Sequence, residues 1–234
     1  MQAAPDLCAI YFAPDPNSPW GQAGSQWLGR CAATKRHPPL PRIEELAPDV
    51  QTALTADPRR YGWHATLKAP FALAPGQDIQ AVLAAMQRLA GEFSAFDLPP
   101  LGVDRRGHFL ALRPMGDCAP LQAVAAACVT RLQPLALPLG ESELARRRRA
   151  PLTPEQDALL CQWGYPWVLN HFHFHFSLSN TLEGVDPSLR VALADAASEH
   201  FASLGPCRFD RLALFVEPEK GADFQLAEFV PLQP

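Results

Sequence analysis

Polar and apolar residues alternate along the stretch from His171 to Ser179, and this pattern is typical of a half-buried β-strand. One face of such a strand would enter a core. The other face would carry three histidines and two serines: His171, His173, His175, Ser177 and Ser179. A second stretch, Trp63–Leu67, matches Phe174–Leu178 position by position, with an aromatic residue, a histidine, an apolar residue, a hydroxyl and a leucine. We therefore expect the fold to bring two His-x-hydroxyl pairs face to face.

The two stretches begin similar halves of the chain. Behind each one, apolar residues recur at helical spacing, first after Asp78 and later after Asp186-Pro187, where an N-cap is followed by proline. A Phe-Asp pair comes next, at Phe96 and at Phe209, 32 and 34 residues after the two motif histidines, His64 and His175. A hairpin pattern then follows in both halves. We interpret this shared order as an internal duplication.

Further elements are expected around the first half. Leu7–Phe12 has the pattern of a strand, and Ser18-Pro19 has the pattern of a helix start. A hairpin with arms near 101–103 and 108–112 would turn at 104–107, and Asp117 would cap the following helix.

The chain reads as a single domain over 1–234 with an insertion between its halves. The first motif half covers about 56–135 and the second about 168–234, whereas the segment of about 141–164 repeats nothing and is expected to be helical. Four arginines, Arg146–Arg149, lie in this insertion. They could clamp a phosphate or another anionic group, or they could form a solvated basic face, and the sequence leaves both interpretations open.

Composition narrows the classes of function. Hydrophobic residues make up 48% of 234 residues, enough for a sizeable core, and no apolar run approaches the length of about 18 that a membrane span needs. The N-terminus has no secretory pattern, and six scattered cysteines without a Cys-x-x-Cys pair fit reduced thiols, so we expect a cytoplasmic protein. A net charge of −4 argues against a general nucleic-acid binder without excluding one.

Two facing histidines can act as base and acid in one reaction, because imidazole titrates near neutral pH, at about 6.5. The neighbouring hydroxyls, Thr66 and Ser177, can donate hydrogen bonds to phosphate oxygens. The chemistry that this set favours is attack of water on a phosphodiester, with no metal, no cofactor and no covalent intermediate.

Two His-x-[Ser/Thr]-Leu strands on duplicated halves resemble the 2H phosphoesterase superfamily, which includes LigT-like RNA 2′-5′ ligases and 2′,3′-cyclic phosphodiesterases. The wider context is similar to the family known as phosphonate metabolism protein, whose genes often lie beside carbon–phosphorus lyase genes. Four motifs carry that similarity: Trp27–Arg30, Arg60–Phe71, Glu143–Arg148 and Trp163–Pro166.

The resemblance implies a bilobal α+β fold, two duplicated lobes each with an antiparallel sheet flanked by helices, and a site in the cleft between the sheets. It implies catalysis by His64 and His175 and phosphate binding by Thr66 and Ser177. Tyr61 and Lys68 would contact the rest of the substrate, and Arg147 is the candidate contact from the arginine run. Lys68 should share the strand face of His64 and Thr66.

The leading hypothesis is a metal-independent cyclic phosphodiesterase that acts on a small phosphorylated substrate, such as a phosphoribosyl cyclic phosphate from phosphonate breakdown. One alternative is an RNA-end enzyme, either a 2′,3′-cyclic phosphodiesterase or a 2′-5′ ligase. A second is a non-catalytic phosphoester-binding module. A third is a metal site built from His171, His173 and His175, since His-x-His on a strand places two ligands on one face. The oligomeric state and the division of roles between the two histidines are left open.

Overall fold

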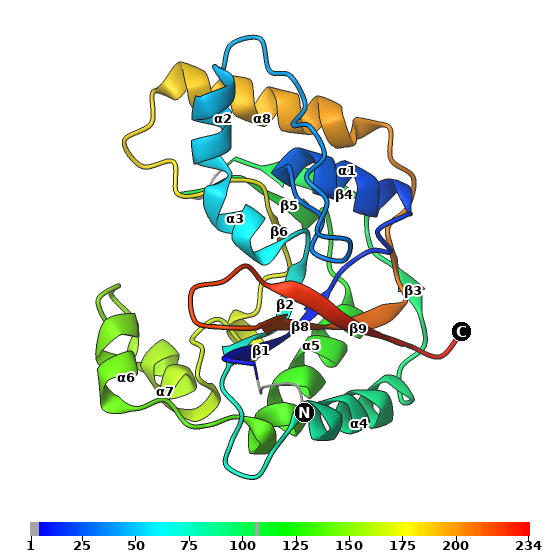
Figure 1. Cartoon of the computed structure of the whole chain (residues 1–234), viewed down its shortest axis with the longest axis vertical. Coiled ribbons are helices and arrows are strands. Elements are labelled where there is room, and N and C mark those ends of the chain that lie inside the picture. The colour runs from blue at the N-terminus through cyan, green and yellow to red at the C-terminus, as the bar shows by residue number, and fades with distance from the viewer. Residues whose placement is uncertain (1–4, 106–107) are drawn as a thin grey trace.

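The computed structural model describes residues 5–105 and 108–234 (Figure 1). The strands that form its main sheet are β1 (Leu7–Phe12), β2 (Ala65–Phe71), β4 (Leu101–Asp104), β5 (Ala111–Pro114), β6 (Phe176–Ser177), β8 (Arg211–Glu217) and β9 (Gln225–Pro231). They are ordered β4-β5-β6-β2-β1-β8-β9, and their pairs are antiparallel. A separate pair joins β3 (Phe96–Asp97) to β7 (Arg208–Phe209).

The helices are α1 (Pro19–Leu28), α2 (Pro48–Leu54), α3 (Ala56–Tyr61), α4 (Ile79–Ala90), α5 (Ala119–Leu132), α6 (Glu141–Arg147), α7 (Pro154–Trp163) and α8 (Pro187–Ala202). Helices α4 and α5 pack on the part of the sheet that contains β2, β8 and β9, while α8 packs on β4 (Figure 1). The helices expected in the insertion, α6 and α7, lie together at one side of the molecule. Among the described residues, no helix is long and apolar enough to cross a membrane.

The expected α+β class with antiparallel strands is confirmed, and the two lobes are parts of one sheet. The part β4-β5-β6 meets the part β2-β1-β8-β9 through a single residue pair, Ala65 with Phe176. The first part combines β6, from the second half of the chain, with the β4–β5 hairpin of the first half. The second part combines β2, from the first half, with the β8–β9 hairpin of the second half. The two sheets expected for the lobes are therefore joined into one sheet at this residue pair.

Equivalent residues of the two duplicated halves pair with each other. Ala65 and Phe176 each follow the motif histidine, and they pair with each other. Phe96 pairs with Phe209, and their rings stack with centroids 5.0 Å apart. Because equivalent residues of the two halves pair in antiparallel fashion at both places, a local two-fold axis relates the halves.

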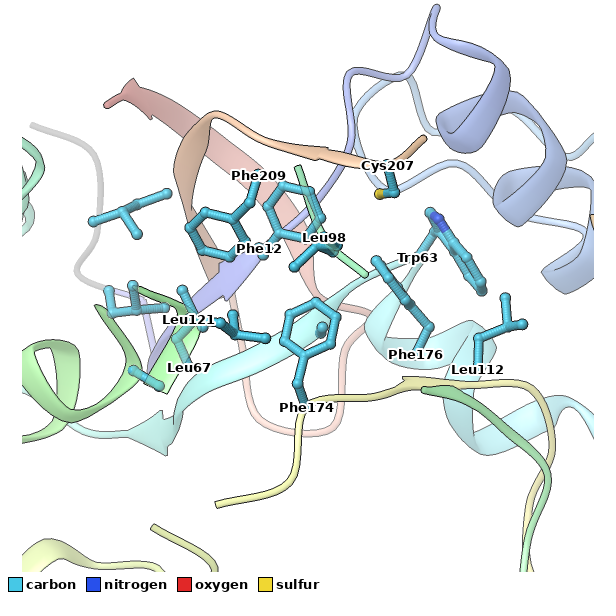
Figure 2. Packing of buried hydrophobic residues seen from close by; sticks show 14 of the residues in the cluster. Phe12, Trp63, Leu67, Leu98, Leu112, Leu121, Phe174, Phe176, Cys207 and Phe209 are labelled. Atoms are coloured by element: carbon cyan, nitrogen blue, oxygen red, sulfur yellow. The ribbon is translucent and has the colours of Figure 1, made fainter. Parts of the chain in front are cut away.

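The apolar side of the motif segments forms the main core. Figure 2 shows Phe174 and Phe176 next to Phe12, Phe209 and Trp63. The Trp63 ring stacks between Phe176, with centroids 4.5 Å apart, and Phe201, with centroids 5.3 Å apart. This stacking fixes the backbone next to His64.

Several predicted boundaries hold and others need correction. Ser18, Asp78 and Asp186 accept the N-cap hydrogen bonds expected of them. Asp117 does not cap α5, because the N-cap position falls on Cys118, whose side chain makes no capping bond. The expected hairpin turn at 104–107 lies partly outside the described residues, which omit 106 and 107.

The prediction of a strand from His171 to Ser179 is wrong in extent. Only Phe176–Ser177 is paired as β6, and His171 belongs to a 3-10 turn over Leu169–His171. The alternation in burial is nevertheless present, since Phe172, Phe174, Phe176 and Leu178 are buried. Apolar periodicity reports which side faces the core, and it does not report whether a neighbouring strand supplies hydrogen bonds.

Candidate active site

The two His-x-hydroxyl pairs lie side by side on one face of the sheet. The pairing of Ala65 with Phe176 places His64 diagonally across from His175, with Thr66 and Ser177 beside them on the adjacent strands. Facing residues of an antiparallel pair point to the same side. All four side chains are partly exposed, whereas Ala65, Leu67, Phe176 and Leu178 are buried.

Both imidazoles are held in the same way. Nδ1 of His64 lies 2.9 Å from the carbonyl oxygen of Gly62, and Nδ1 of His175 lies 2.8 Å from the carbonyl oxygen of His173. A carbonyl only accepts, so each Nδ1 carries the proton and donates it. In the neutral ring Nε2 is then an unprotonated base. Thr66 Oγ1 lies 3.3 Å from Nε2 of His64, which places the hydroxyl beside that base.

Aromatic side chains surround His64. Its ring stacks on Tyr11 with centroids 3.9 Å apart, and Tyr61 and Phe215 lie at 6.0 and 6.2 Å. Burial among these rings disfavours the charged imidazolium and lowers the pKa of His64 to about 4. The bond to Gly62 opposes this shift, and His175 adds to it. His64 is therefore neutral at physiological pH and can accept a proton.

His175 has a more cationic surrounding. Its pKa is also lowered from the ordinary value, first by burial and then by the positive charges of Arg113 and His173. Arg113 lies on β5. Ala111 pairs with Ser177 and Leu112 pairs with Phe176, and the same register puts Arg113 opposite His175. An anion bound at the site would offset these charges and raise the pKa of His175.

Tyr61, expected as a substrate contact, lies beside His64. Its ring stacks on Phe224 with centroids 5.0 Å apart, and the Arg60 guanidinium lies 5.0 Å from its centre. Tyr61 also interacts electrostatically with Tyr11 and Tyr165. Tyr11 and Tyr61 therefore both lie next to His64, and Tyr165 acts on these two tyrosines.

Arg147 reaches this group from the insertion. Its Nε donates to Glu143 at 2.9 Å, and its Nη1 donates to the carbonyl oxygen of Gly164, the residue before Tyr165. Arg146 also bonds Glu143, and Arg148 bonds Asp157. Carboxylates of the insertion itself therefore pair with three of the four arginines. These contacts position Tyr165, while a direct contact between Arg147 and substrate stays a prediction.

Lys68 does not share the face of His64 and Thr66. Tyr11 pairs with Thr66 but Ile10 pairs with Lys68, so β2 carries an extra residue at this point. Such a bulge places consecutive side chains on the same side of the strand. Lys68 is only 3% exposed, and its Nζ donates to Gln133 Oε1 at 2.7 Å at the end of α5. The expectation of a shared face was wrong because the alternation breaks at the bulge.

The histidines before His175 are not gathered around a common point. His171 pairs with Glu155 at 3.1 Å, and His173 offers its carbonyl oxygen to His175. Among the described residues, no group of three or more His, Cys, Asp or Glu side chains is placed to hold a metal ion.

Sequence reasoning assigned no role to Tyr11, Arg113 and Tyr165. Tyr11 and Arg113 come from strands beside the motif strands, and their place depends on sheet register. Tyr165 comes from the end of the insertion. Its presence in the Trp163–Pro166 motif was the available signal.

Comparison with known proteins places this chain in a family. A family model described as "Protein of unknown function (DUF1045)" matches residues 66–225, more than half of the chain. The chain belongs to the DUF1045 family. The matched part of this DUF1045 protein includes Thr66, His175 and Ser177, and it begins two residues after His64.

Two curated relatives of this DUF1045 chain are named ribose 1,5-bisphosphate phosphokinase PhnN. The protein from Janthinobacterium sp. (strain Marseille) is 38% identical over 226 residues, and the protein from Laribacter hongkongensis (strain HLHK9) is 40% identical over 222 residues. Both alignments cover 95% of this chain but only 50% and 51% of the relatives. The chain therefore spans about half the length of the curated relatives it matches.

Solved structures similar to this DUF1045 chain include E. coli LigT complexed with phosphate, with a TM-score of 0.47 and 12% identity over 99% of this chain and 100% of that one. Another, described as a phosphoesterase, has a TM-score of 0.43 and 13% identity over 98% and 100% of the two chains. The expected likeness to LigT-like proteins is found along the whole chain.

Proposed function

We propose that this protein is a phosphodiesterase that hydrolyses a small cyclic phosphate ester by two-histidine acid–base catalysis. The observation that carries the proposal is the matched geometry of His64 and His175. Each ring donates Nδ1–H to a backbone carbonyl and so presents Nε2, and each is accompanied by a hydroxyl, Thr66 or Ser177, two residues further on. Two such groups can bind a phosphate and move two protons.

The different surroundings of the two rings support different roles. His64 is held neutral by its aromatic neighbours, with a pKa of about 4, and so serves as the base. His175 lies where an anionic substrate would favour its protonated form, and so serves as the acid.

The proposed step is a single displacement at phosphorus. A water oxygen attacks the phosphorus atom, and Nε2 of His64 takes the water proton. The bond between phosphorus and one ring oxygen breaks, and Nε2–H of His175 protonates that oxygen. The product carries a phosphomonoester and a free hydroxyl on the same molecule. Thr66 and Ser177 donate hydrogen bonds to the non-bridging oxygens.

The relatives' name supports a substrate. A ribose 1,5-bisphosphate phosphokinase acts on a ribose with phosphates on O1 and O5. Opening of 5-phosphoribosyl 1,2-cyclic phosphate at the O2–phosphorus bond would produce that compound. This link also agrees with the resemblance to phosphonate metabolism proteins. We therefore propose this cyclic phosphate as the substrate and O2 as the leaving oxygen.

The test measures phosphomonoester release in the presence of chelator. The panel contains 5-phosphoribosyl 1,2-cyclic phosphate, nucleoside 2′,3′-cyclic phosphates and a 2′-5′-linked dinucleotide. We expect chelator-resistant turnover of the first, reduced by about 10²- to 10⁴-fold in His64→Gln and in His175→Gln. The control is His108→Gln, because that side chain is 81% exposed and pairs with Glu183.

Three other outcomes would change the assignment. Faster turnover of the nucleotide substrates would favour the RNA-end hypothesis. Loss of activity on chelation would favour a metal site. Absence of turnover on the whole panel, with ligand binding retained in both variants, would leave a binding module.

A further inference from the structure

A pocket of about 160 Å³ lies beside the proposed site, between the end of β5 and the segment before His175. Its lining includes Arg113, Asp117, Cys118 and His173. Two of these residues, Arg113 and His173, are the cationic groups that act on His175. The pocket therefore shares its polar wall with the site and extends away from it.

The charges that face the pocket come from three elements. Arg113 projects from β5, its side chain is 30% exposed, and its Nε lies 3.1 Å from Asp104 on β4. His173 comes from the segment before β6 and is exposed. Asp117 also lines the pocket and would repel an anion. The first turn of α5, which has no side-chain cap, opens beside it and favours negative charge.

Arg113 is placed to bind a group of the substrate other than the reacting phosphate. His64 immediately precedes β2, His175 immediately precedes β6, and Arg113 lies on β5. These three strands are neighbours in the sheet, and neighbouring strands lie about 4.8 Å apart. A phosphate between the two histidines would be centred about 7 Å from β5, one and a half such spacings. A sugar carrying a second phosphate could bridge this distance along the sheet.

The two sides of the site also differ in charge. Phe12 of β1 pairs with Ala65, and the same register puts the next residue, Ala13, beside His64, at the place that corresponds to Arg113 beside His175. Tyr11 and Phe215 add aromatic surface on the His64 side. A doubly phosphorylated ligand would therefore be oriented in one direction only.

We propose that the Arg113–His173 pocket binds a second phosphoryl group of the substrate, with Arg113 as the residue that selects for it. This inference rests on the proposed function, because it takes the reacting phosphate to lie between His64 and His175. Arg113 makes charge-assisted hydrogen bonds to the distant phosphate, and His173 adds a further donor when it is protonated. The pocket fixes which ring oxygen faces His175.

The test compares two substrates that differ only in the second phosphate: 5-phosphoribosyl 1,2-cyclic phosphate and ribose 1,2-cyclic phosphate. In Arg113→Gln, we expect KM for the first substrate to rise by about 10- to 100-fold and KM for the second to stay within about twofold. Arg113→Lys, which keeps the charge, should recover part of the loss. Arg208→Gln is the matched control, because Arg208 is exposed and pairs with Asp97 on the remote β3–β7 pair.

Equal losses on both substrates in Arg113→Gln would overturn the inference and leave the proposed function intact, since Arg113 would then serve the reacting phosphate or His175. If the wild type hydrolyses neither substrate, the proposed function fails. Titration with ribose 5-phosphate then tests whether the pocket binds a phosphoryl group. Binding by the wild type that weakens in Arg113→Gln would support the pocket, and equal binding by both would overturn it.

Discussion

Replacement of Lys68 by methionine tests the most consequential correction, that this residue lies in the interior and not in the substrate site. The Lys68 ammonium is buried between β2 and α5, where it donates to Gln133 Oε1 at 2.7 Å and lies 5.2 Å from the centre of the Phe71 ring. Burial lowers its pKa from 10.5 to about 8, and Cys128 opposes the shift. Methionine is of similar length and carries no charge.

The expected effect follows from that shift. Holding the ammonium charged at pH 7 costs the folded state about 3 kcal/mol, at roughly 1.4 kcal/mol for each pKa unit. The substitution removes this cost, but it also removes the hydrogen bond to Gln133. Loss of that bond destabilises the folded state by about 1 to 2 kcal/mol, because the amide oxygen is left without its donor. The free energy of unfolding of Lys68→Met at pH 7 should therefore lie about 1 to 2 kcal/mol above the wild-type value.

The sign of the pH dependence follows from proton binding. Between pH 8 and 10.5 the unfolded chain binds more protons at Lys68 than the folded chain does, so wild-type stability rises with pH through this window. The penalty is fully present below pH 8 and is relieved toward pH 10.5. Any stability advantage of Lys68→Met should shrink as pH increases.

Urea unfolding at pH 7 and pH 9.5 measures both effects, and kcat/KM on the preferred cyclic substrate is measured in parallel. Lys220→Met, at an exposed turn, controls for the loss of one positive charge. We expect kcat/KM of Lys68→Met to stay within about threefold of wild type, which corresponds to less than 1 kcal/mol of transition-state stabilisation. A loss of more than tenfold with unchanged unfolding would mean that Lys68 reaches the substrate, and the placement behind the bulge would be refuted.

Two further predictions concern the histidines and their support. The proposed roles require a neutral His64 and a protonated His175. We therefore expect kcat/KM to fall below about pH 4 and to fall again as the pH rises through the lowered pKa of His175. A flat kcat/KM profile from pH 4 to 8 would contradict these roles. Trp63→Leu should lower the free energy of unfolding by about 2 to 4 kcal/mol in urea titrations, because the Trp63 ring stacks between Phe176 and Phe201, and a loss below 1 kcal/mol would show that this stacking is dispensable.

The sequence was informative where a local pattern decides the structure. Alternation around His175 identified which side chains are buried, and the repeat of Trp63–Leu67 predicted that two equivalent strands meet. The pairing of Ala65 with Phe176 and of Phe96 with Phe209 agrees with that duplication. Helix starts at Ser18 and Asp78 were predictable because one side-chain oxygen suffices to cap a helix.

The sequence was uninformative where a distant partner decides the structure. A bulge inserts one residue without a signature in composition, so the face of Lys68 could not be read from its distance to His64. Arg113 acquires its place from the register between β5 and β6. Helix α3 carries no clear signature in the sequence, because Ala56–Tyr61 is short and contains a proline.

Duplication alone would give two identical imidazoles, and identical groups are poorly suited to be base and acid at the same pH. The strands that flank the motif strands remove this symmetry. Tyr11 and Phe215 keep His64 neutral, while Arg113 lies opposite His175 on β5 and draws anionic ligands to that side. A phosphate that binds on the Arg113 side would raise the pKa of His175 more than the pKa of His64, which is enclosed by aromatic rings. The neutral state of His64 therefore depends on its aromatic neighbours, and the orientation of the substrate depends on Arg113.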